Sequence, residues 1–179
     1  MYKVNKLIDK RIHKQAFFFE FQTKLRPKYF IDKIEQGIRE PGNMNYQTNV
    51  LGGMTAWNYF AKDIELLVLL KMLTNHLDQK IDLCKYVLDE AWGIRTAFND
   101  YTKRHSHDGC VVSGILYLSK SKQYTYFPEL DEVVKPMPGK VVLFSPMLDH
   151  YTKPSLEAKP KYAIPFNYKE IKDWNNNRI

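Results

Sequence analysis

The sequence has few of the features that place a chain in a membrane or cross-link it. Only two of its 179 residues are cysteines, Cys84 and Cys110, and they fit neither a metal-ligand nor a redox spacing. We therefore expect two reduced core thiols and a cytoplasmic protein. The apolar run "IELLVLLKML" is far shorter than the roughly 20 residues that span a bilayer. The basic start, "MYKVNKLIDKRIHK", has no apolar segment, so no secretory signal is predicted.

Positive charge is plentiful but not clustered. The 27 basic and 20 acidic residues give a net charge of +7, yet no run of five or more cations occurs. Dispersed charge permits a nucleic-acid partner without indicating one. With 44% hydrophobic and 14% aromatic residues, the chain is long enough to bury a sizeable core, and we expect one domain over residues 1–179.

The first half of the chain is predicted to contain one strand and two helices. Residues 16–22 are rich in β-prone aromatics. Residues 26–40 have apolar residues at helical spacing after a proline, which predicts a helix. A loop rich in Gly, Pro and Asn covers residues 41–54, and residues 55–88 show a second helical pattern with a leucine stripe.

The second half changes to short β-like runs. They cover residues 90–98, 110–118, 123–129, 140–146 and 161–168. "KPMPGK" supplies a tight turn before the fourth run. This pattern predicts a mainly β, α+β fold: a jelly roll over residues 88–169, with residues 1–87 as an N-terminal layer whose helices pack on one sheet.

Histidines gather where one of these strands begins. His105 and His107 are two residues apart, so on an extended segment they face the same side. His150 follows the fourth strand, and adjacent strands of a barrel can bring it beside the first pair. Three ligands on one face of a metal are typical of non-haem Fe(II) enzymes, usually two histidines and a carboxylate. Asp108 lies one place beyond the position of such a carboxylate. His13 and His76 are isolated and are expected to be surface or hydrogen-bonded residues.

Lys161 opens the last strand, shortly after His150. An inward-pointing cation there is costly to bury unless an anion pairs with it. A dicarboxylate co-substrate could bind the metal at one end and this ammonium at the other. The alternative is that Lys161 is one more solvated lysine.

The order of these residues resembles a known family. The pattern W…H-x-H…SG-x-x-YL…P-x-PG-x-x-x-LF-S-P…H…K-x-x-x-x-FN is similar to that of the iron(II)- and 2-oxoglutarate-dependent oxygenases, in the prolyl-4-hydroxylase-like branch with phage and bacterial members. The matching positions are Trp92, His105, His107, Ser113, Gly114, Tyr117, Leu118, Pro136, Pro138, Gly139, Leu143, Phe144, His150, Lys161, Phe166 and Asn167. "TNVLGGMTAW" also resembles a phage-encoded member, which would place the protein in the host cytoplasm.

The resemblance implies a double-stranded β-helix, another name for the jelly roll, together with Fe(II), 2-oxoglutarate and O₂. It implies His105 and His150 as metal ligands. It also implies that Lys161 and the Tyr117 hydroxyl bind the far carboxylate of 2-oxoglutarate, with Ser113 in support. In such enzymes 2-oxoglutarate is decarboxylated to succinate and CO₂ while a substrate C–H bond is oxidised.

The second ligand departs from the family pattern of His-x-Asp. His107 itself can be the ligand, which gives a three-histidine site. Asp108 can turn in as the second ligand instead. In a third arrangement His107 is the first ligand and Gly109 takes the second position, as in the iron halogenases.

The resemblance favours hydroxylation of a peptide or protein side chain, with proline expected by analogy. An oxidative nucleic-acid demethylase and a halogenase-type variant are the alternatives among enzymes. A non-catalytic jelly-roll binding module is the alternative from another class, and in it the histidines would be scattered. The oligomeric state is not fixed by the sequence.

Overall fold

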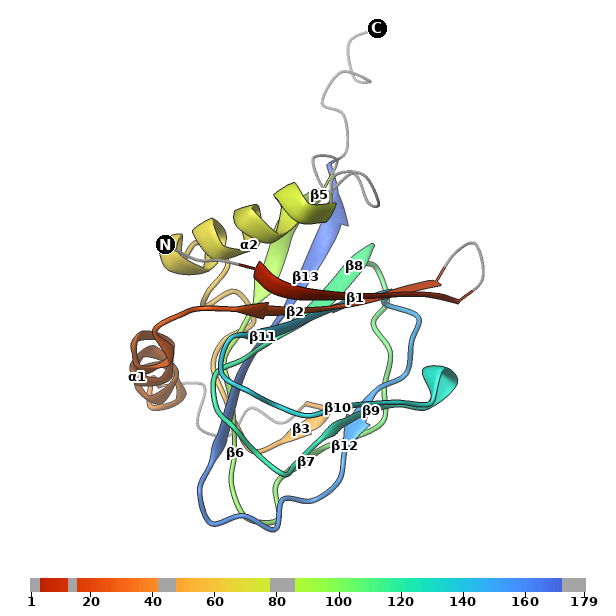
Figure 1. Ribbon diagram of the computed structural model, residues 1–179. Coiled ribbons are helices and arrows are strands. Elements are labelled where there is room, and N and C mark those ends of the chain that lie inside the picture. The colour runs from red at the N-terminus through yellow and green to blue at the C-terminus, as the bar shows by residue number, and fades with distance from the viewer. Residues whose placement is uncertain (1–3, 13–15, 42–47, 78–85, 172–179) are drawn as a thin grey trace, which may run out of the picture.

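A computed structural model describes residues 4–12, 16–41, 48–77 and 86–171, with side chains described from Ala16 onward except at 74–77 (Figure 1). The elements of the first half are β1 (Val4–Ile12), β2 (Ala16–Thr23), α1 (Pro27–Ile38), β3 (Val50–Leu51), β4 (Gly53–Met54) and α2 (Ile64–Leu77). Those of the second half are β5 (Tyr86–Ala91), β6 (Ile94–Thr96), β7 (Tyr101–Thr102), β8 (Val112–Tyr117), β9 (Thr125–Phe127), β10 (Glu132–Val134), β11 (Lys140–Phe144), β12 (Tyr151–Thr152) and β13 (Lys161–Glu170).

The strands form one large sheet and two small ones. The large sheet has the order β1-β2-β11-β8-β13-β6-β4, and β5 also pairs with β13. A smaller sheet, β10-β9-β12, faces it, and β3 pairs with β7. All of the described pairs are antiparallel. The predicted jelly roll with helices on one sheet is thus confirmed, and Figure 1 shows the small sheet set apart from the large one.

Strand alternation divides the interior into two cores. On one face of the large sheet, Leu116, Leu143 and Phe166 pack in a cluster with apolar side chains of both helices. On the other face, Tyr117 and Phe144 belong to a second cluster that lies between the sheets. Because side chains alternate along a strand, the polar residues placed between these apolar ones project into the inter-sheet space.

Gly114 lets the first core close over β8. A Cβ added at Gly114 would lie 2.3 Å from Cζ of Phe166, which is fully buried on the neighbouring strand. Any larger residue at position 114 would displace that ring, which explains why the sequence has a glycine inside a strand.

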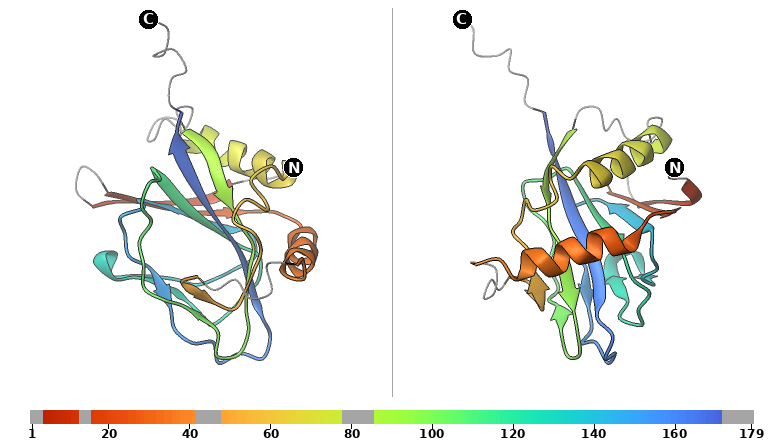
Figure 2. Two further views of the ribbon diagram at one scale, coloured as in Figure 1. Left: turned by 180° about the vertical axis from the view of Figure 1, so that it is seen from behind. Right: turned by 90° about the vertical axis from the view of Figure 1, so that its left-hand side faces the viewer.

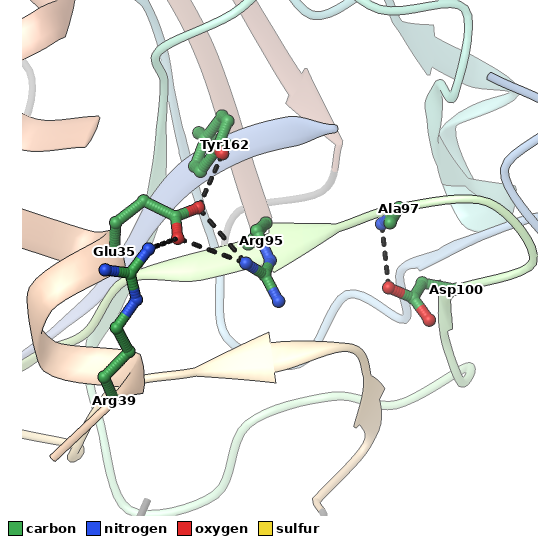
Figure 3. A network of polar contacts seen from close by, with 6 residues as sticks. All are labelled: Glu35, Arg39, Arg95, Ala97, Asp100 and Tyr162. Atoms are coloured by element: carbon green, nitrogen blue, oxygen red, sulfur yellow. Dashed lines mark hydrogen bonds and ion pairs between the residues drawn. The ribbon is translucent and has the colours of Figure 1, made fainter. Parts of the chain in front are cut away.

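The two helices lie on the same side of the large sheet, away from the small sheet (Figure 2). α1 begins at Pro27, whose ring suits the first turn of a helix. A partly buried polar network joins α1 to the sheet: Glu35 accepts hydrogen bonds from Tyr162 on β13, at 2.6 Å, and from Arg95 on β6, at 3.1 Å (Figure 3). Arg39 adds an ion pair to the same carboxylate at 3.5 Å.

Asp63 joins the two helices. Its Oδ1 accepts a hydrogen bond from the backbone N–H of Leu66 at 3.1 Å, which caps the start of α2. Its Oδ2 forms an ion pair with Lys33 on α1 at 2.5 Å and accepts a hydrogen bond from Tyr29. The side chain is only 1% exposed, so these contacts replace its hydration.

The structure corrects several predicted boundaries. The second helical pattern, predicted for residues 55–88, is helical only over Ile64–Leu77, and Tyr86 already belongs to β5. The predicted strand at 90–98 is divided between β5 and β6 at Trp92 and Gly93. Strands from the N-terminal half belong to the large sheet, where β2 pairs with β11 and β4 with β6.

The sequence also led to predictions for the two cysteines, for His13 and His76, and for membrane-spanning segments. Cys110 is a free, half-buried thiol, whereas Cys84 and His13 lie outside the described residues, as does the side chain of His76. Among the helices that the structure describes, none is long and apolar enough to cross a membrane.

We predict that Asp63→Asn lowers the free energy of unfolding at pH 7 by about 1–2 kcal/mol, because it removes a buried ion pair. Burial alone opposes ionisation, but Lys33 and the hydrogen bonds from Leu66 and Tyr29 hold the pKa of Asp63 below its usual value. The carboxylate therefore stabilises the fold above pH ~4, and this contribution is lost as the pH falls through the folded-state pKa.

Urea unfolding of both proteins at pH 7 and pH 3 measures this difference, which should shrink at pH 3. Asp32→Asn is the control: the Lys28–Asp32 pair is exposed, so its loss should change the free energy by less than about 0.5 kcal/mol. A difference of equal size at both pH values would exclude the ion pair as its cause.

Candidate metal centre

Two chain segments that follow strands are held together at the mouth of the inter-sheet space. The backbone N–H of His150 donates to the carbonyl oxygen of His105 at 2.9 Å, and the reverse hydrogen bond is 3.2 Å long. The backbone N–H of His107 donates to the carbonyl oxygen of Pro146 at 2.9 Å, just beyond β11. This bridge places three histidines from two distant parts of the sequence side by side.

The three imidazoles converge on one point. One ring nitrogen of each of His105, His107 and His150 lies within 4.8 Å of the corresponding nitrogens of the other two. The Nε2 atoms of His105 and His107 are 3.2 Å apart. Two nitrogens bound to one metal at 2.0–2.1 Å and at right angles would be about 3 Å apart. The arrangement therefore has the dimensions of a metal site.

The outer nitrogens of two rings fix their protonation. His105 Nδ1 lies 2.8 Å from the carbonyl oxygen of Lys103, and His150 Nδ1 lies 3.2 Å from that of Leu148. A carbonyl oxygen can only accept, so each Nδ1 carries the proton and each Nε2 has a free lone pair. The third ring, His107, has its Nδ1 2.9 Å from both Ser113 Oγ and Asn167 Oδ1.

The surroundings keep these rings uncharged. Burial lowers the pKa of His105 and of His107, and it lowers that of His150 well below the usual value, with a further contribution from the neighbouring imidazoles. His150 also packs on the fully buried rings of Phe127 and Phe144. Neutral imidazoles are the form that binds transition metals, so the donor set fits an iron(II) ion.

The predicted alternatives for the second ligand differ in where the structure places them. The cluster consists of His105, His107 and His150, and the exposed Asp108 is not part of it. Gly109 has a φ of 75° and open space around the position of a Cβ. If His107 were the first ligand and Gly109 the second position, His105 would have no role. The geometry thus favours His107 as the second ligand, an assignment that metal binding can test.

Lys161 lies in a cavity that continues inward from the histidines. The cavity is lined by all three histidines, Tyr117, Thr125 and Lys161, among others. Lys161 is only 2% exposed, and its ammonium has no hydrogen bond or ion pair within the described part of the chain. Burial lowers its pKa to about 7. A buried cation without a partner indicates a site for an anion.

Tyr117 lines the same cavity as Lys161 and carries a hydroxyl group. Its hydroxyl is 2.7 Å from Thr125 Oγ1, and burial raises its pKa. Either hydroxyl can be the donor, so Thr125 can donate to Tyr117 while Tyr117 donates to a bound carboxylate. Thr125 was not singled out by the sequence, because one threonine in a short strand carries no distinguishing signal.

A second, more open cavity of about 220 Å³ meets the first at the histidines. Trp57, Trp92, Glu90 and Asp108 line it, together with His105 and His107 among other residues. Trp92 borders both cavities, is 4% exposed, and its indole N–H has no hydrogen-bond partner among the described residues. Trp57 packs edge-on against Trp92 at 4.5 Å between ring centroids. This cavity combines aromatic surface with two carboxylates.

Ser113 lies elsewhere than the sequence-based expectation placed it. Its hydroxyl contacts His107 and Asn167, and Ser113 is not among the described residues that line the Lys161 cavity. Asn167 was part of the motif but had no predicted role, and Glu90, which accepts a hydrogen bond from Asn167, was not singled out. Their proximity to His107 results from strand register, which the sequence motif does not encode.

We predict that Lys161→Met raises the free energy of unfolding of the ligand-free protein by roughly 2–5 kcal/mol at pH 6, since it removes a buried, unpaired charge. The folded-state pKa lies below that of the unfolded state, so the wild type becomes more stable as the pH rises from about 7 towards 10. The advantage of the variant should therefore shrink over that range.

Chemical denaturation at pH 6 and pH 9 measures both effects. Lys159→Met, at an exposed position two residues away, should change the free energy by less than about 0.5 kcal/mol. A variant at Lys161 that is less stable than the wild type at pH 6 would mean that the ammonium is well solvated or paired.

Comparison with known proteins gives structural but not sequence matches. No family model matches the chain, and no curated protein matches its sequence. A viral collagen prolyl hydroxylase from Paramecium bursaria chlorella virus 1, solved as a 2-oxoglutarate complex, superposes with a TM-score of 0.64 at 17% identity, covering 86% of this chain and 96% of that chain.

Two bacterial structures show the same similarity. A Pseudomonas putida prolyl-4-hydroxylase has a TM-score of 0.66 at 14% identity, covering 87% of this chain and 93% of that chain. HygX from Streptomyces hygroscopicus, with nickel and 2-oxoglutarate bound, has a TM-score of 0.58 at 14% identity, covering 86% and 82%. The predicted resemblance is thereby confirmed at the level of structure: the chain has the double-stranded β-helix fold of the iron(II)- and 2-oxoglutarate-dependent oxygenases.

Proposed function

We propose that the protein is a non-haem Fe(II)- and 2-oxoglutarate-dependent dioxygenase that hydroxylates a peptidyl side chain, of proline type. The observation that carries the proposal is the convergence of three lone-pair nitrogens beside a cavity that ends at a buried, unpaired ammonium. A binding module with scattered histidines has no need for this arrangement. The prolyl hydroxylases of the same fold support the choice of substrate.

His105, His107 and His150 would hold the metal through Nε2. Bound there with 2-oxoglutarate and O₂, iron(II) supplies the oxidant for a substrate C–H bond, with succinate and CO₂ as co-products. Lys161 would pair with the far carboxylate of 2-oxoglutarate. The Tyr117 hydroxyl, which donates to Thr125 Oγ1 in this structure, would instead donate a hydrogen bond to the same carboxylate and accept one from Thr125. The aromatic rings around His150 exclude water from this end of the site.

The open cavity would receive the substrate. Trp57 and Trp92 line this cavity and offer apolar surface to a compact ring such as that of proline. Glu90 and Asp108 line the cavity, and no lysine or arginine is among its described lining. An acidic lining disfavours a polyanionic nucleic acid despite the net charge of +7, so a peptide is the better candidate.

Anaerobic titration with Fe(II) and then 2-oxoglutarate should produce a visible metal-to-ligand charge-transfer band in the wild type. His150→Ala should abolish the band. Lys161→Met should require at least tenfold more 2-oxoglutarate, since a buried charge pair is lost. Lys159→Met should behave like the wild type. Absence of a band in the folded wild type would overturn the proposal.

Incubation with a library of proline-containing peptides should add one oxygen atom to a prolyl residue, detected by mass spectrometry with stoichiometric succinate. Trp57→Ala should raise KM for the peptide about tenfold or more while the affinity for 2-oxoglutarate stays unchanged, since Trp57 borders only the open cavity of the two. Leu156→Ala, at a residue that is 83% exposed, should leave both constants unchanged. Oxidation of another side chain instead would retain the dioxygenase and reject the prolyl substrate.

A further inference from the structure

The polar groups behind His107 form a continuous chain. Asn167 on β13 is paired in register with Ser113 on β8 and, across its other edge, with Glu90 on β5. Directly opposed residues share one face of a sheet, so the three side chains meet. A register shift between β13 and β5 lies immediately after Asn167, an irregularity of the kind that re-aims side chains beside functional sites.

Glu90 sets the orientation of the Asn167 amide. Asn167 Nδ2 lies 2.9 Å from Glu90 Oε2, and a carboxylate can only accept. The amide nitrogen therefore faces Glu90, and Oδ1 faces the other way, 2.9 Å from His107 Nδ1 and 2.9 Å from Ser113 Oγ. With the amide reversed, the Glu90 contact would be lost, and Nδ2 would face His107 Nδ1 as a donor, which would leave the imidazole proton on Nε2.

The Asn167 oxygen in turn sets the protonation of His107. Oδ1 accepts from the Ser113 hydroxyl and from His107 Nδ1, so that nitrogen carries the proton. The Nε2 lone pair is left facing the Nε2 atom of His105 at 3.2 Å. Ser113 and Asn167 are 0% and 6% exposed, so neither can exchange these partners for bulk water.

From this geometry we propose that Glu90, Asn167 and Ser113 are positioning residues that present His107 to a metal as a third neutral nitrogen ligand. The site then suits an imidazole at position 107, because the atom that contacts this side chain on the side away from the metal is the acceptor oxygen of Asn167. A carboxylate at that position would meet this oxygen with no proton to offer. The inference rests on the proposed metal centre but not on the substrate or on 2-oxoglutarate.

Anaerobic Co(II) binding to the folded apoprotein, followed by its visible d–d spectrum at fixed pH, tests the proposal without any turnover. Asn167→Ala should weaken Co(II) binding about 10–100-fold, as loss of a partner behind a ligating histidine typically does. His107→Asp should bind at least tenfold more weakly than the wild type. The control, Asp89→Asn, removes a neighbouring carboxylate on β5 that pairs with Lys169, and should leave the affinity unchanged.

A double exchange guards against a simple packing defect. In Glu90→Gln/Asn167→Asp, the amide and the carboxylate swap strands, so an acceptor again faces His107 and a donor again faces residue 167. We expect Co(II) affinity within about threefold of the wild type, whereas Asn167→Ala stays weak although circular dichroism shows it folded.

The outcomes distinguish a wrong positioning role from a wrong metal centre. If the wild type binds Co(II) and either Asn167→Ala binds equally well or His107→Asp binds as tightly as the wild type, the positioning role is wrong and the proposed function stands. A double exchange as weak as Asn167→Ala likewise contradicts the role. If the folded wild type binds no Co(II), the metal centre itself is wrong, and both proposals fall.

Discussion

The pairing of β13 with β8 along one edge, and with β5 and β6 along the other, determines where the chemistry of this protein can lie. Alternate residues of β13 face the helix-covered core, where Ile164 and Phe166 are fully buried. The residues between them, from Lys161 to Asn167, face the inter-sheet space. One strand thus supplies the buried cation at one end and the amide behind His107 at the other, roughly 20 Å apart along the chain. Ser113 and Tyr117 on β8 and Glu90 on β5 are placed by the register in which their strands pair with β13.

The two ends of β13 differ in whether their polar side chains have hydrogen-bond or ion-pair partners. Behind His107, the ring Nδ1, the Ser113 hydroxyl and the Asn167 amide all have hydrogen-bond partners, and the last partner is the Glu90 carboxylate. At Lys161 the ammonium has no partner among the described residues, a state that lowers stability and is typical of a position kept for binding. The site is therefore rigid on the metal side and electrostatically incomplete on the co-substrate side. An anion that enters would complete the network rather than compete with it.

The sequence was sufficient for the fold class and for the residues that converge, but not for the contacts among them. The i, i+2 spacing of His105 and His107 already indicated a shared face, and the strand patterns indicated a jelly roll. The start of β5 at Tyr86 was missed, because over a few residues a short apolar pattern fits a helix and a strand equally well. β7, β10 and β12 were missed because strands of two or three residues are too short to show an alternation pattern, and β1 because charged residues interrupt its apolar ones. The Glu90–Asn167 contact depends on the register of β13 against β5, which no local pattern signals.

The tryptophan pair gives the protein an optical property of its own. Trp57 and Trp92 are in ring contact at 4.5 Å, and the Trp92 ring lies 6.5 Å from that of His107. Indole emission is sensitive to nearby charge, to hydrogen bonding at the N–H and to open-shell ions, and the Trp92 N–H has no partner within the described chain. Because Trp92 borders both cavities, occupancy of either one changes the environment of the same fluorophore. The intrinsic fluorescence of the unlabelled protein should therefore change when either cavity is occupied.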